Sequence, residues 1–133
     1  MARLSEHFAT EEFVCKCGCG LGLELDTVSL LLVDLLERIR AVYGRPMHIT
    51  SGLRCAKHNA EVGGSPASAH MRGLAADIRV SSGHERYELL RAAFAVGCKR
   101  IGDGPVGAVH FDVDSRLPQE VCWIYPGKRS SSD

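Results

Sequence analysis

Two short segments of the sequence alternate apolar and polar side chains, as half-buried β-strands do. In residues 74–80 (LAADIRV) apolar side chains occupy one face, and Asp77 lies on the other face. In residues 109–114 (VHFDVD) the polar face carries His110 and Asp112. The chain must therefore bury one face of each strand in a core, while the opposite faces carry side chains that can bind metals or move protons.

The segments around these strands predict the remaining elements. A helix is expected after Asp26, which is a plausible N-cap, and it should end at Gly44. Residues 47–51 predict a short strand, residues 52–73 a long connection with one helical turn near residues 56–62, and residues 82–96 a second helix. This order predicts an α+β fold with a small, mainly antiparallel sheet and flanking helices.

Composition limits the function classes. The chain has 133 residues, 45% of them hydrophobic, which suits one core. Its 16 basic residues balance 16 acidic ones, so we expect no nucleic-acid partner and no membrane insertion. Segment 1–13 carries charges where a signal peptide has its apolar stretch, so we expect no signal peptide and a protein that is cytoplasmic at synthesis. We divide the chain into an irregular, cysteine-rich arm (1–25), a domain (26–125) and a disordered tail (126–133).

Six cysteines occur, at positions 15, 17, 19, 55, 98 and 122, and three of them belong to the run CKCGCG. A reducing cytoplasm disfavours a disulfide framework. Thiolates of this run together with Cys55 could hold a structural zinc ion, although the spacing differs from the usual C-x2-C. Three states remain open from the sequence: free thiols, a structural metal site at Cys15, Cys17, Cys19 and Cys55, and disulfides.

His70, Asp77 and His110 form a candidate set of metal ligands. A catalytic zinc ion takes three protein ligands and keeps one open position. Gly73 lets the chain turn between His70 and the following strand, so that both ligands can approach one point. The alternative is that both histidines are ordinary core or surface groups and that the polar strand faces are simply solvated.

Four segments carry a resemblance to a known family: SGLRCAKHN (51–59), VGGSPASAHMRGLAADI (62–78), GAVHFDVD (107–114) and WIY (123–125). They resemble the zinc D-alanyl-D-alanine carboxypeptidases, in the branch found in phages and prophages. That fold is shared with D-alanyl-D-alanine dipeptidases and the hedgehog signalling domain. The resemblance implies that His70, Asp77 and His110 bind zinc. It also implies that Arg54 binds the substrate, through its carboxylate or carbonyl, and that Ser68 either contacts substrate or fixes its loop.

The general base is where this sequence departs from the family pattern. Relatives carry an acidic residue three positions before the last zinc histidine, or a second histidine two before it; here those positions are Gly107 and Ala108. Asp112 lies about 7 Å beyond His110 on the same strand face and is the first candidate, although it could instead orient a zinc ligand. Asp103 is the second candidate.

Together with the candidate metal ligands, the resemblance implies a zinc metallopeptidase that cuts peptide bonds in the stem peptides of bacterial peptidoglycan. The resemblance implies a D-Ala-D-Ala carboxypeptidase or a phage-lysin endopeptidase. We expect the peptidoglycan peptide as its partner, and we expect the chain to be a monomer. A phage holin, a phage tail or a secretion system would bring it to the cell wall. The alternatives are a zinc-stabilised module that binds peptidoglycan without cutting it, and a structural component of a virion.

Overall fold

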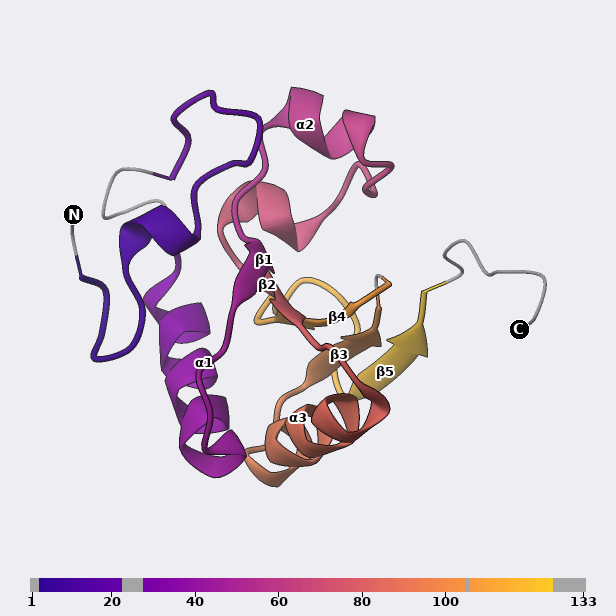
Figure 1. Ribbon diagram of the computed structural model, residues 1–133. Coiled ribbons are helices and arrows are strands. Elements are labelled where there is room, and N and C mark those ends of the chain that lie inside the picture. Colours follow the sequence, from indigo (N-terminus) through magenta and orange to yellow (C-terminus); the bar gives the residue numbers. More distant parts are fainter. Residues whose placement is uncertain (1–2, 23–27, 105, 126–133) are drawn as a thin grey trace.

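The computed structural model describes residues 3–22, 28–104 and 106–125 (Figure 1). The elements are, in chain order, η1 (Thr10–Glu12), α1 (Leu30–Tyr43), β1 (Ile49–Ser51), α2 (Ala56–Glu61), η3 (Ala69–Arg72), β2 (Ala75–Arg79), α3 (Gly83–Ala95), β3 (Arg100–Asp103), β4 (Ala108–Asp112) and β5 (Val121–Ile124). Within these residues, no helix is long and apolar enough to cross a membrane.

The strands form one five-stranded sheet in the order β1-β2-β4-β3-β5. All neighbouring pairs are antiparallel except β3 and β5, which run parallel. This confirms the predicted α+β class with a mainly antiparallel sheet. The sequence patterns predict β1, β2 and β4 but neither β3 nor β5. The helical turn predicted near residues 56–62 of the long connection corresponds to α2, whereas η3 has no counterpart among the predicted elements.

The core lies between the sheet and two helices. Helices α1 and α3 contact each other and lie along one side of the sheet, whereas α2 lies apart from both (Figure 1). The buried cluster combines side chains from both helices and from the central strands: Leu32, Leu36, Ile39, Ala76, Ile78, Leu89, Ala92, Val109 and Phe111. The apolar faces predicted for β2 and β4 are therefore the faces that form the core.

The ends of α1 follow from local hydrogen bonding. Ser29 is the N-cap, and its hydroxyl accepts a hydrogen bond from Leu31 N at 3.2 Å. The expected cap, Asp26, lies outside the described residues, and the helix begins later than the sequence predicted. At the other end Gly44 adopts a left-handed conformation, with φ of 77°, as expected for a glycine after the last helical residue.

The N-terminal segment packs against the rest of the chain. Phe8 and Phe13 are buried in the core cluster, and Phe13 O accepts a hydrogen bond from Leu53 N at 2.8 Å. The carboxylate of Glu37 accepts a hydrogen bond from His7 N at 2.7 Å and lies 2.7 Å from the His7 ring. The division of the chain at residue 25 stays a prediction, and the predicted tail 126–133 lies outside the described residues.

Candidate metal centre

One row of residues crosses the sheet on the face opposite the core helices. The strand pairings place Ser51 beside Asp77, Asp77 beside His110, His110 beside Gly102, and Gly102 beside Trp123. Residues paired directly across neighbouring strands point to the same face of a sheet. The sheet therefore brings residues from five separate strands to one surface, and all of them except Gly102 carry side chains there.

The three predicted metal ligands meet on this surface. Asp77 Oδ1 lies 3.2 Å from His70 Nε2 and 2.9 Å from His110 Nδ1. All three side chains are buried, with 2%, 1% and 4% of the surface of His70, Asp77 and His110 exposed. Burial contradicts the alternative in which these strand faces are simply solvated.

A short turn presents His70 to the sheet. Ser68 is the N-cap of η3, and its hydroxyl accepts a hydrogen bond from His70 N at 3.2 Å. Gly73 ends η3 in a left-handed conformation, with φ of 71°. The sequence also predicts the turn at Gly73. The Ser68 hydroxyl caps η3 through this contact, and whether Ser68 also contacts substrate stays a prediction.

The outer nitrogen of each histidine ring is also held. His70 Nδ1 donates a hydrogen bond to Gly52 O at 2.7 Å, and His110 Nε2 lies 2.7 Å from Asp112 Oδ2. Metal-binding histidines typically donate their second N–H to a carbonyl or carboxylate in this manner. The nitrogens that remain, His70 Nε2 and His110 Nδ1, both face Asp77.

This arrangement tests whether a metal ion fits. If each ring is neutral and its proton lies on the outer nitrogen, two nitrogen lone pairs and a carboxylate oxygen face one another. A cation relieves that repulsion, and two imidazoles with one carboxylate are the donors that zinc prefers. The three candidate ligand atoms also lie within 4.8 Å of one another. The residues therefore fit a zinc ion.

The electrostatics of the ligands follow from their mutual contacts. Burial alone would raise the pKa of Asp77, but hydrogen bonds with His110 and His70 lower that pKa well below its usual range. Burial alone would lower the pKa of His110, whereas its contacts with Asp112 and Asp77 raise that pKa above its ordinary value. The cluster thus holds negative charge at Asp77 and favours positive charge on the His110 ring.

Both oxygens of the Asp112 carboxylate form hydrogen bonds. Its Oδ1 accepts hydrogen bonds from Arg100 Nε at 2.7 Å and from Asp114 N at 3.1 Å, while Oδ2 contacts His110. The guanidinium of Arg100 also donates to Pro118 O at 2.7 Å. Both carboxylate oxygens of this candidate base are therefore occupied, and one of them holds the imidazole of His110.

Arg54 and Asp103, two further candidates, lie in different surroundings. Arg54 Nη2 lies 3.4 Å from Asp77 Oδ2, and its other donors bind Ser51 Oγ and Asn59 Oδ1, both at 3.1 Å. Asp103 forms an ion pair with Arg86. Arg54 lines the cavity at the cluster, whereas Asp103 is not among the described residues that line it.

The cavity over the cluster has a volume of about 730 Å³. Trp123 and Tyr125 form part of its wall, with ring centroids 5.5 and 6.0 Å from the His110 ring. A Cβ at Gly102 would lie 2.6 Å from Tyr125 Cε2, so only glycine allows this approach. Burial and the charge of Asp77 raise the pKa of Tyr125 to about 12, which keeps its hydroxyl protonated.

Sequence reasoning missed Tyr125, although the segment WIY carried the signal. Side chains two positions apart in a strand point to the same face, so Trp123 and Tyr125 would lie together once residues 121–124 were recognised as a strand. The carboxylates that line the cavity, among the described residues, belong to Asp77 and Asp112. Both already contact imidazole rings.

Comparison with known proteins agrees with this geometry. A search of curated proteins found no match. The sequence profile of the family described as Peptidase M15 matches residues 6–112, which is most of the chain and includes the three clustered residues. The match confirms the resemblance found in the sequence. The chain belongs to the Peptidase M15 family of zinc-dependent metallopeptidases.

Proposed function

We propose that this protein is a zinc peptidase that hydrolyses a peptide bond in the stem peptides of bacterial peptidoglycan, with D-alanyl-D-alanine as the first target. The observation that carries the proposal is the convergence of His70, Asp77 and His110 at a cavity, in a chain of the Peptidase M15 family. These three residues would hold the zinc ion. When bound, zinc supplies Lewis acidity at the cluster.

Arg54 is proposed to bind the carboxylate or carbonyl of the substrate peptide. Its guanidinium reaches the cavity beside Asp77, and contacts with Ser51 and Asn59 fix its orientation. A guanidinium offers five N–H donors in a planar fork, so donors remain for a substrate oxygen. The protonated hydroxyl of Tyr125 can donate a further hydrogen bond, and Trp123 provides an apolar wall.

Asp112 is proposed to act as a positioning residue. It holds His110 through Nε2 and so keeps Nδ1 directed toward Asp77. Its other oxygen is bound to Arg100 and to the backbone at Asp114. These contacts favour the orienting role that the sequence left open over the role of general base.

The proposal is tested by incubating the zinc-loaded protein with purified peptidoglycan and with a peptide that ends in D-Ala-D-Ala. Products are identified by mass spectrometry, with a chelator-treated sample and His110→Ala as controls. Released D-alanine would identify a carboxypeptidase, and cut cross-links an endopeptidase. Absence of product from the zinc-loaded protein would contradict the proposal.

A second candidate function is a module that binds peptidoglycan without cutting it. The observation that favours it is that both cavity carboxylates, Asp77 and Asp112, are already engaged. Zinc-dependent co-sedimentation with peptidoglycan, without any product, would support this candidate. A virion structural role, the remaining expectation from the sequence, would show neither hydrolysis nor binding.

A further inference from the structure

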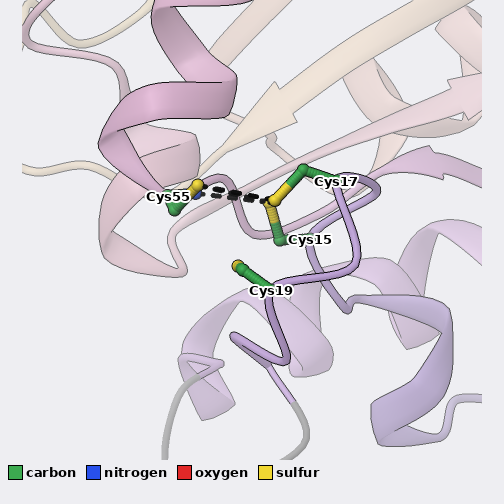
Figure 2. A group of neighbouring side chains, drawn as sticks. All are labelled: Cys15, Cys17, Cys19 and Cys55. Atoms are coloured by element: carbon green, nitrogen blue, oxygen red, sulfur yellow. Dashed lines mark hydrogen bonds between the residues drawn. The ribbon is translucent and has the colours of Figure 1, made fainter.

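Four of the six cysteines form a cluster outside the cavity described above. Cys15, Cys17 and Cys19 belong to the N-terminal segment, and Cys55 directly precedes α2. The four side chains gather around one point (Figure 2). Their sulfur atoms lie within 4.8 Å of one another. Cys98 and Cys122 are free thiols that do not belong to this group.

The sulfur separations are those of a shared metal ion. Cys15 Sγ lies 3.5 Å from Cys17 Sγ and 3.8 Å from Cys55 Sγ, and the sulfurs of Cys17 and Cys55 are 3.7 Å apart. A tetrahedral site with zinc–sulfur bonds of about 2.3 Å places its sulfurs about 3.8 Å from one another. A disulfide would instead require a separation of about 2.0 Å.

The backbone around the cluster is arranged to present sulfur atoms. Cys15 N donates to Leu21 O at 2.8 Å, which closes a loop around the three cysteines of the N-terminal segment. Gly18 lies between two of them with φ of 85°, a conformation that other residues rarely adopt. The amide of Cys55 donates to Cys15 Sγ, and the amide of His58 donates to Cys55 Sγ, both at 3.4 Å. Such N–H···S contacts stabilise thiolates.

We propose that Cys15, Cys17, Cys19 and Cys55 bind a structural zinc ion, separate from the metal at the histidine cluster. Four thiolates complete a tetrahedral site and leave no position for substrate, which is the pattern of structural zinc. The site joins residues 40 positions apart, since Cys55 lies far from Cys15 in sequence. The zinc ion ties the N-terminal segment to the segment that leads into α2.

This second ion also supports the cavity. Cys55 directly follows Arg54, and Arg54 N donates to His70 O at 3.1 Å. Two residues earlier, Gly52 O accepts the hydrogen bond that orients the His70 ring. The ion therefore anchors the segment 52–55, which positions both a candidate zinc ligand and the candidate substrate-binding arginine.

The test is the metal content of the full chain, purified with zinc under reducing conditions and measured by inductively coupled plasma mass spectrometry. We expect two zinc ions per wild-type chain, one in His110→Ala and one in the double variant Cys17→Ser, Cys19→Ser. Cys122→Ser, an exposed thiol outside the cluster, is the matched control and should keep two. A wild-type chain with one ion, lost in His110→Ala, would overturn the proposal.

A spectroscopic measurement avoids dependence on the cysteine variants, which could fail to fold. Cobalt-loaded His110→Ala should show the strong near-ultraviolet sulfur-to-cobalt absorption of a thiolate site, because its four cysteines are intact. Lack of this absorption in a folded, cobalt-exposed protein would also refute the site. Neither readout uses hydrolysis, so failure here is distinguishable from failure of the proposed function.

Discussion

Asp112→Asn tests the role of the carboxylate that holds His110. In the wild type both carboxylate oxygens accept hydrogen bonds, from His110 Nε2 at 2.7 Å, from Arg100 Nε at 2.7 Å and from Asp114 N at 3.1 Å. An asparagine offers one oxygen and one NH2 group. In either orientation the NH2 group faces an N–H donor, of His110 or of Arg100.

Both orientations weaken metal binding or stability. If the amide NH2 faces His110, the ring must accept a hydrogen bond at Nε2 and carry its proton on Nδ1, the atom that would bind zinc. If it faces Arg100, a buried donor loses its partner, at a cost of about 1–3 kcal/mol. Loss of such an orienting group typically lowers metal affinity about 10- to 100-fold, or about 1.4–2.8 kcal/mol.

The assay is competition for zinc with a chromophoric chelator, followed by hydrolysis measured at saturating zinc. Asp34→Asn is the matched control, because the Asp34 side chain is 69% exposed on α1. A positioning role predicts weaker zinc binding and hydrolysis that recovers with excess zinc. Wild-type zinc affinity together with absent hydrolysis would refute this reasoning and restore Asp112 as the general base first predicted from the sequence.

Three further substitutions test the roles of Gly102, Arg54 and Glu37. Gly102→Val should destabilise the protein by about 1–3 kcal/mol, because its Cβ would meet Tyr125; an unchanged urea midpoint would contradict this. Arg54→Lys should lower kcat/KM at least about tenfold without changing zinc content, because a lysine cannot reproduce the planar fork; unchanged kinetics would exclude its proposed role. Burial raises the pKa of Glu37, but its hydrogen bonds, including those with His7, lower the pKa overall. The stabilisation from these hydrogen bonds is therefore present above the ordinary glutamate pKa of about 4.5 and is lost as the pH falls through the lowered pKa. Glu37→Gln should be less stable than the wild type near neutral pH, and the difference in their free energies of unfolding, measured with urea, should shrink as the pH falls. A difference that does not depend on pH would contradict this linkage.

The central part of the fold was predictable because its signals are local. Alternation in residues 74–80 and 109–114 identified β2 and β4, and the apolar face of each strand does belong to the core. Strand β3 has four residues, including Gly102, and no alternating pattern. Strand β5 pairs with it in parallel at the edge of the sheet. Such pairing depends on residues distant in sequence, so no local pattern revealed either strand.

The candidate metal ligands of the site were also predictable from the sequence, whereas the orientation of their side chains was not. Spacing and residue type brought together His70, Asp77 and His110, and the structure places them in contact. The direction of the His110 ring could not be read from the sequence, since Asp112 shares its strand face under either orientation. Only the hydrogen bond at Nε2 shows which nitrogen Asp112 holds.

The pairing of Asp77 with His110 across β2 and β4 has a consequence for how the chain folds. A slip of one residue between these strands would turn His110 toward the helices and place an apolar neighbour beside Asp77. Misaligned chains therefore lack the complete ligand set. An ion that binds this set stabilises the correctly paired chains relative to the misaligned ones. Metal binding would therefore favour the correct strand register while the protein folds.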